Sequence, residues 1–158
     1  MTKKKIFALF SVLVILDAIT KYVVVSRLTQ FDTIVVIPHF FNIVLVRNRG
    51  IAFGLFSGIG KFYKNIVLIL IALFVVYFLF GFLRETGNKV LYFSVTMIIA
   101  GIVGNIIDRL INGSVIDFID LYIKRFHWPS FNLADIYITV GIVIILIFLI
   151  RDWKSANA

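Results

Sequence analysis

Residues 66–83 read IVLILIALFVVYFLFGFL, eighteen positions without one charged side chain. A helix needs about 20 mostly apolar residues to cross the hydrocarbon core of a bilayer, so this stretch predicts a membrane span. Three other stretches have the same character, and we expect four spans in all: residues 6–25, 66–83, 90–110 and 133–150. The sequence therefore predicts an all-α polytopic membrane protein that forms a single domain over residues 1–158.

The composition agrees with a membrane protein. Of the 158 residues, 61% are hydrophobic and 15% are charged, and the mean hydropathy is +1.06. A soluble domain of this length needs far more polar surface. The formal net charge of +8 is assigned to basic residues that flank the spans and meet anionic lipid head groups, and we expect no binding of nucleic acid.

Basic residues also predict the orientation of the spans, because they gather on the cytoplasmic side of short connections. Four spans place both termini on one side, where seven basic residues lie in short segments: Lys3, Lys4, Lys5, Arg84, Lys89, Arg151 and Lys154. Both termini are therefore expected in the cytoplasm, and the connections at 26–64 and 112–131 on the outer side. Within the first connection, residues 33–37 and 42–47 are typical of short strands around Pro38.

Ionisable side chains inside a membrane span are costly, so each one is a functional candidate. Asp17 and Lys21 are spaced i, i+4 and share a helix face, which favours a paired structural bridge over direct chemistry. Asp108 and Arg109 end the third span, where Arg109 has the alternative of reaching the head groups. Asn105 lies four residues before Arg109 on the same face, which indicates a polar lining rather than a lipid-facing surface.

Aspartates also stand at the outer boundary of the spans. Asn132 and Asp135 resemble a capping box at a helix start, and Asp117 has the alternative of capping a short turn. From spacing alone these structural roles weigh as much as catalysis. Two carboxylates in a poorly hydrated site share one proton, and such a pair can hydrolyse an amide with water. Asp120 is the third acid of this boundary.

Other hydrolytic chemistries fit less well. The chain has no cysteine, which excludes a cysteine nucleophile, thiolate metal sites and disulfides. Ser57 and Ser114 lie near glycine, and Ser114 has no Lys or His at helical spacing, which weakens serine chemistry. A His-Glu-x-x-His motif is missing, which excludes zinc proteolysis of that type. We expect neither a metal nor a cofactor.

Five stretches, taken in order, resemble bacterial lipoprotein signal peptidase, also called signal peptidase II, a family of aspartic endopeptidases with four membrane helices. They are DAITK at 17–21, RNRGIAFG at 47–54, GNIIDR at 104–109, GSVIDF at 113–118 and FNLAD at 131–135. Each stretch alone is weak. Five of them in this order on four spans are highly specific.

The resemblance implies that Asp117 and Asp135 form the catalytic pair. It implies substrate-binding or supporting roles for nine further residues: Asp17, Lys21, Asn48, Gly54, Asn105, Asp108, Arg109, Asn132 and Ala134. It also implies a small extracytoplasmic β-cradle in the first outer connection, which agrees with the strand-like residues there.

The function that the resemblance implies is removal of signal peptides from diacylglyceryl-modified prolipoproteins, on the amino side of the lipidated cysteine. The enzyme would work as a monomer in the bacterial cytoplasmic membrane, with these substrates and membrane lipids as partners and the site near the outer face. A small proton- or ion-coupled transporter and a structural scaffold are the alternatives. A transporter should hold its acids mid-span, whereas Asp117 and Asp135 lie at one edge, and a scaffold gives no reason for Asn105 or Arg109.

Overall fold

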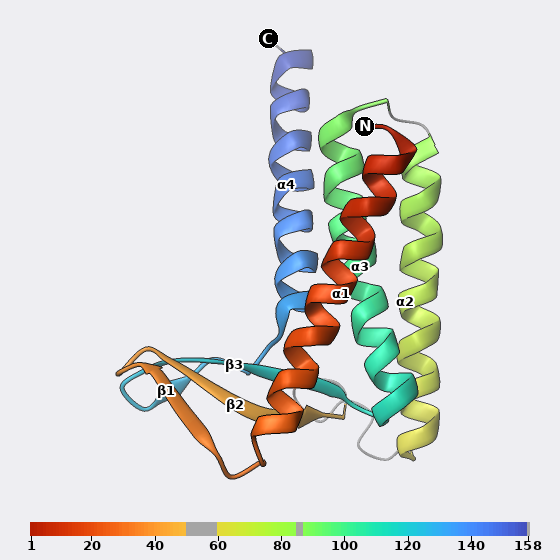
Figure 1. Ribbon diagram of the computed structural model, residues 1–158. Helices are drawn as coiled ribbons and strands as arrows, with labels where there is room; N and C mark the ends of the chain where they lie inside the picture. Colours follow the sequence, from red (N-terminus) through yellow and green to blue (C-terminus); the bar gives the residue numbers. More distant parts are fainter. Residues whose placement is uncertain (50–59, 85–86, 158) are drawn as a thin grey trace.

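The computed structural model of the protein describes residues 1–49, 60–84 and 87–157 (Figure 1). Four helices dominate it: α1 (Lys3–Arg27), α2 (Lys61–Arg84), α3 (Lys89–Asn112) and α4 (Leu133–Ala156). All four are long and apolar enough to cross a membrane, and each predicted span lies inside one of them. Both termini lie at one end of the helix bundle, and a small sheet lies at the other end (Figure 1).

Polar and glycine residues set the helix ends. Asn88 begins α3, where its side chain accepts a hydrogen bond from the N–H of Val90 at 2.8 Å. Gly113 ends the same helix with a φ of 65°, in the left-handed region that glycine adopts without strain. The N–H of Gly113 donates to the carbonyl of Arg109 at 3.1 Å. α3 therefore stops sharply, and the chain turns at once into the sheet.

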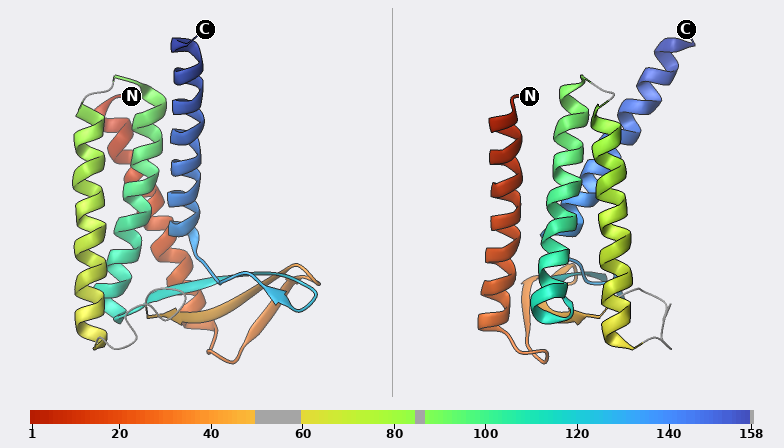
Figure 2. Two further views of the ribbon diagram at one scale, coloured as in Figure 1. Left: turned by 180° about the vertical axis from the view of Figure 1, so that it is seen from behind. Right: turned by 90° about the vertical axis from the view of Figure 1, so that its right-hand side faces the viewer.

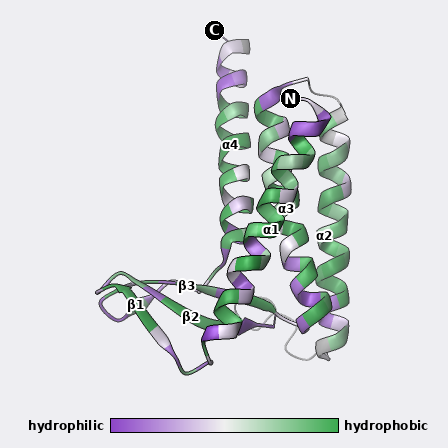
Figure 3. Ribbon diagram, in the orientation of Figure 1, coloured by the Kyte–Doolittle hydropathy of each residue, from purple (hydrophilic) through white to green (hydrophobic). Residues whose placement is uncertain are grey.

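α3 is the central helix of the bundle, because it packs against α1, α2 and α4. A side chain at Gly101 would collide with the carbonyl oxygen of Ala134, and one at Gly104 would lie 2.5 Å from Oδ2 of Asp17. These two glycines thus allow α4 and α1 to approach α3 closely. The outward faces of the helices are hydrophobic along most of their length, as lipid contact requires (Figure 3).

The sheet has four antiparallel strands in the order β1-β2-β3-β4 and projects to one side of the bundle (Figure 2). Its strands are β1 (Thr33–Ile37), β2 (Phe41–Asn48), β3 (Val115–Ile123) and β4 (Phe126–His127). The sequence predicted strands in the first connection alone, whereas the second connection supplies β3 and β4. Aspartate is depleted from strands. β3 contains two aspartates, and for that reason the sequence did not predict it as a strand. The all-α class therefore describes the four spans only.

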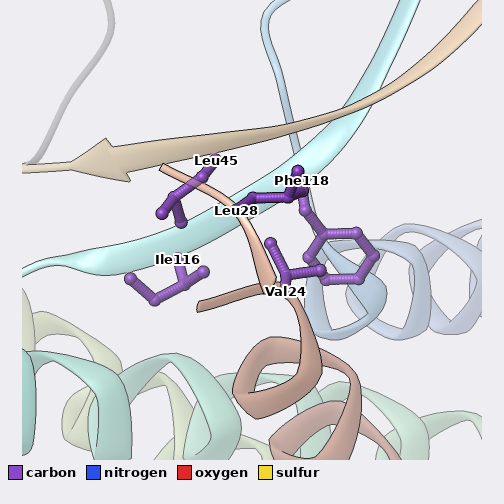
Figure 4. Close-up of a cluster of buried hydrophobic side chains, with 5 residues drawn as sticks. All are labelled: Val24, Leu28, Leu45, Ile116 and Phe118. Carbon is purple, nitrogen blue, oxygen red and sulfur yellow. The ribbon is translucent and has the colours of Figure 1, made fainter. Parts of the chain in front are cut away.

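A small apolar cluster joins the end of α1 to the sheet (Figure 4). Its buried members are Val24, Leu28, Leu45, Ile116 and Phe118. Full burial of one such large side chain from water is worth roughly 1.5–3 kcal/mol. Because Ile116 and Phe118 flank Asp117 in the chain, the cluster fixes the position of that aspartate.

Candidate functional site

Buried polar side chains converge where α1, α3 and α4 meet the sheet. Six of them are at most 9% exposed: Asp17, Lys21, Asn105, Asp108, Asp117 and Asn132. Asp135 stands among them and is half-buried. Burial of so many polar groups beside membrane spans is costly unless every group is paired. Their mutual hydrogen bonds define the candidate active site.

Asp117 lies in β3 with 2% of its surface exposed. Its carboxylate accepts two side-chain hydrogen bonds, from Nδ2 of Asn48 at 2.8 Å and from Nδ2 of Asn132 at 2.7 Å. Burial raises the pKa of Asp117 from 3.8 to about 6, although the hydrogen bond from Asn48 opposes this rise, and the nearby charge of Asp135 adds to the rise. This carboxyl therefore holds a proton closer to neutral pH than an exposed aspartate does.

Asp135 lies in the first turn of α4, where the predicted capping box is present. Its N–H donates to Oδ1 of Asn132 at 3.0 Å, and its Oδ2 accepts the N–H of Asn132 at 3.2 Å. The other carboxylate oxygen, Oδ1, accepts a hydrogen bond from Nδ2 of Asn105 at 2.9 Å. Capping a helix and facing the polar cluster are thus compatible roles for one carboxylate.

Asn132 connects the two aspartates. Its side-chain amide donates to Oδ1 of Asp117, while its backbone N–H donates to Oδ2 of Asp135. The same Nδ2 lies 3.2 Å from Oδ1 of Asn105 and 3.3 Å from the carbonyl oxygen of Ile116. One fully buried residue therefore holds β3, α3 and the start of α4 in register around the carboxylate pair.

The predicted Asp17–Lys21 pair is present, and a third residue joins it. Nζ of Lys21 lies 2.7 Å from Oδ2 of Asp17 and 3.0 Å from Oδ2 of Asp108. It also donates to Oδ1 of Asn105 at 3.2 Å, which directs the amide nitrogen of Asn105 toward Asp135. This buried ion network therefore orients a direct partner of the carboxylate pair.

The two carboxylates of the network also anchor the backbone around the pair. Oδ1 of Asp17 accepts the N–H of Ala134 at 3.0 Å, and Oδ2 of Asp108 accepts the N–H of Ile116 at 3.0 Å. Ala134 precedes Asp135, and Ile116 precedes Asp117. Each aspartate of the pair thus follows a residue whose backbone is held by the network.

Arg109 lies at the edge of the cluster and is half-buried. Its guanidinium donates to the carbonyl of Asn105 at 3.1 Å and is close enough to Asp117 and Asp135 to interact with their charges. The alternative that Arg109 reaches lipid head groups is therefore weaker than a role at the site. Gly54, the remaining residue assigned by resemblance, lies outside the described residues.

A second polar cluster on the sheet was not predicted. Asp120 is buried, accepts a hydrogen bond from Nδ2 of Asn42 at 2.9 Å, and lies 2.8 Å from Nδ1 of His127. The ring of His127 stacks on Tyr122, with centroids 4.9 Å apart. Only pairing between β2 and β3 brings Asn42 to Asp120, so sequence spacing held no signal for it. The bonds from Asp120 to Asn42 and His127 tie β2, β3 and β4 together.

Among the described residues, one apolar groove is lined by Asp135, and another is lined by Asn105, the hydrogen-bond partner of Asp135. One, of about 390 Å³, includes Asp135 and lies between Trp128 and Val140. The other, of about 210 Å³, lies between α2, α3 and α4 and includes Asn105 and Arg109. Over the described residues, no three His, Cys, Asp or Glu side chains are grouped to hold a metal ion.

Over the described residues, four helices long and apolar enough to cross a membrane, with two carboxylates held beside buried polar side chains at one end of the bundle, define a multi-pass membrane protein with a candidate site for acid–base chemistry. Residues 9–151 match the family described as signal peptidase (SPase) II. The chain belongs to the signal peptidase II family, and it is therefore a membrane peptidase.

Similar proteins agree with this assignment. The lipoprotein signal peptidase of Thermodesulfovibrio yellowstonii is 45% identical over 141 residues, covering 89% of this chain and 90% of the relative. That of Staphylococcus aureus (strain JH9) is 40% identical over 144 residues, covering 90% and 85%. A solved structure described as a bacterial membrane enzyme superposes with a TM-score of 0.85 at 33% identity, over 97% of this chain and 92% of that one. The transporter alternative finds no support among these relatives.

Proposed function

We propose that this chain is an aspartic endopeptidase that removes the signal peptide from diacylglyceryl-modified prolipoproteins, cutting on the amino side of the lipidated cysteine. Membership of the signal peptidase II family and relatives named lipoprotein signal peptidase support this substrate class. Asp117 and Asp135 are the catalytic pair in this proposal. The enzyme works as a monomer among membrane lipids.

The observation that carries the proposal is the shared partner of the two carboxylates. Asn132 donates its side-chain amide to Asp117 and its backbone N–H to Asp135. Each carboxylate keeps a second amide donor, Asn48 for Asp117 and Asn105 for Asp135. Donors on both sides position the pair without neutralising it, which suits carboxylates that must exchange a proton with substrate and water.

In this proposal Asp117 holds the shared proton before the reaction, and its pKa, raised to about 6 by burial, supports that role. The Asp135 carboxylate takes a proton from water, and the resulting hydroxide adds to the carbon of the scissile amide. Asp117 gives its proton to the carbonyl oxygen at the same time. When the tetrahedral intermediate collapses, the C–N bond breaks and the leaving amine takes the proton from Asp135. Asp117 takes a proton from a hydroxyl of the intermediate, which becomes the product carboxylic acid, and the pair returns to its one-proton state.

The membrane grooves supply places for the substrate. The groove between α2, α3 and α4 is apolar except near Asn105 and Arg109, which suits the apolar segment of a signal peptide that lies beside polar backbone near the cut. The groove that includes Asp135 and Trp128 suits the apolar part of the lipidated cysteine. One groove is lined by Asp135 itself, and the other by Asn105, whose side-chain amide donates to Asp135, so a substrate that fills both would bring its scissile bond close to Asp135.

The proposed orientation puts both termini in the cytoplasm and the sheet, as a cradle, at the outer face of the bacterial cytoplasmic membrane. Basic residues support it, because Lys4, Lys5, Lys89 and Lys154 lie at the end of the bundle that carries the termini. Secreted prolipoproteins are then cut where they leave the membrane.

The test is cleavage of a lipidated prolipoprotein by the purified protein, read as a gel shift. Asp117→Asn and Asp135→Asn are each expected to lower turnover by about 10²- to 10⁴-fold, the usual contribution of a general acid or base. Asp120→Asn is the matched control, because Asp120 lies in the same strand, is also buried, and bonds elsewhere. Near-parental turnover of either pair variant contradicts the assignment.

A further inference from the structure

A third groove lies at the opposite end of the bundle from the carboxylate pair. Its volume is about 310 Å³, and it lies among α1, α2 and α3. Its walls include Ile6, Phe10, Phe80, Leu83 and Ile99. The proposed peptidase function uses neither this groove nor any residue of it.

The groove lies between α1 and α2, which each pack on α3 and, over the described residues, do not bring their backbones close to each other. In the side view, α3 lies between α1 and α2 (Figure 2). α3 forms the floor, with Ile99 and Thr96 among its lining residues. The hydroxyl of Thr96 donates to the carbonyl of Tyr92 at 2.6 Å, so its hydrogen is already used inside the helix. The occupant of the interior must therefore be apolar.

The mouth of the groove is positively charged. Lys3 lines it at the first residue of α1, next to Lys4 and Lys5. The first turn of α1 contains no acidic residue, and the amino end of a helix carries a partial positive charge of its own. An occupant with an apolar tail and a negatively charged head matches both the walls and the mouth.

We propose that this groove binds one molecule of an anionic phospholipid, with an acyl chain between α1 and α2 and its phosphate against Lys3. The surrounding bilayer offers acyl chains everywhere, so filling the groove does not by itself select a lipid. The positive charge at the mouth selects the lipid, because one nearby lysine raises the affinity for an anionic head group about fivefold. The lipid would bridge α1 and α2 at the end of the bundle where, over the described residues, their backbones do not approach each other closely.

Native mass spectrometry of the full chain tests the proposal. Purified protein is mixed with phosphatidylglycerol or with phosphatidylcholine of the same acyl chains. One phosphatidylglycerol should be retained about fivefold more than phosphatidylcholine. Lys3→Gln should remove this preference. Lys4→Gln, the matched control, makes the same charge change one residue away, does not line the groove, and should retain the preference.

Two further measurements separate the head group from the chain. Ile6→Trp fills the groove and should abolish retention of both lipids while cleavage of prolipoprotein stays unchanged. Glycerol phosphate, which has no acyl chain, should displace the bound lipid poorly. The proposal would be overturned if Lys3→Gln and Lys4→Gln lost the preference for phosphatidylglycerol equally, or if Ile6→Trp retained lipid. It would also be overturned if glycerol phosphate displaced the bound lipid as efficiently as phosphatidylglycerol does.

Discussion

Replacement of Lys21 by methionine tests whether the buried ion network holds the carboxylate pair in place. Nζ of Lys21 lies 2.7 Å from Asp17 and 3.0 Å from Asp108, and only 4% of the residue is exposed. Methionine keeps much of the volume but removes the charge. Two buried carboxylates would then face each other without a cation between them.

Removal of one partner from a buried ion pair costs about 3–5 kcal/mol. We expect a free energy of unfolding lower by about 3 kcal/mol, because Asp17 and Asp108 keep their backbone donors at Ala134 and Ile116. Cleavage should fall as well, since Asn105 would lose the donor that directs its amide toward Asp135, a member of the proposed catalytic pair.

The assay is reversible unfolding in mixed micelles by titration with sodium dodecyl sulfate. Lys21→Met combined with Asp108→Asn should be more stable than Lys21→Met alone by at least about 0.5 kcal/mol, because one uncompensated charge is gone. Lys5→Met is the control: Lys5 is an exposed lysine of the same helix and should change stability by less than about 0.5 kcal/mol. A Lys21→Met chain as stable as the parent, or losses that simply add in the double variant, would refute the reasoning.

Three other predictions concern the chemistry, the orientation and the substrate. The rate constant kcat/KM should fall as pH rises through the pKa of Asp117, about 6, because a deprotonated acid cannot donate a proton. Asn48→Leu removes a hydrogen bond that lowers this pKa, so it should move the fall in kcat/KM to higher pH. A fall at an unchanged pH would assign the proton to another group. A single cysteine at Arg125, exposed in the turn after β3, should react with an impermeant maleimide in intact cells, and one at Gly87 should not; the reverse pattern would invert the orientation. An unlipidated prolipoprotein in the same bilayer should be cut far more slowly than its diacylglyceryl form, because the anchored chains fix the height of the cysteine; equal rates would remove this positioning role.

The spans and the start of α4 could be predicted because their signals are local. An apolar run such as residues 66–83 fixes a helix by length alone. The capping box of Asn132 and Asp135 and the ion pair of Asp17 and Lys21 depend on spacings of three and four residues within one helix. Each of these predictions is confirmed.

The rest of the site depends on contacts between distant segments. Asp108 reaches Lys21 only because Gly104 allows α1 to lie close against α3. Asp117 was open to interpretation as a turn cap, and it lies in a strand because β2 supplies the pairing partner and the apolar cluster supplies the burial. Helix packing and strand register leave no trace in the spacing of a single sequence, so resemblance to a family had to supply these roles.

Because β2 pairs with β3, the candidate site can form only late in the synthesis of the chain. Asn48 leaves the ribosome long before Asp117, and two membrane helices must be inserted between them before the strands can meet. A nascent chain that stops after α3 has neither aspartate of the proposed catalytic pair, so it cannot cut its neighbours by that chemistry. The pairing of β2 with β3 and the packing of α1 on α3 each join a segment that precedes the connection between α2 and α3 to a segment that follows it. Two separately synthesised halves, divided near Gly87, thus carry complementary surfaces from which the whole can reassemble in the membrane.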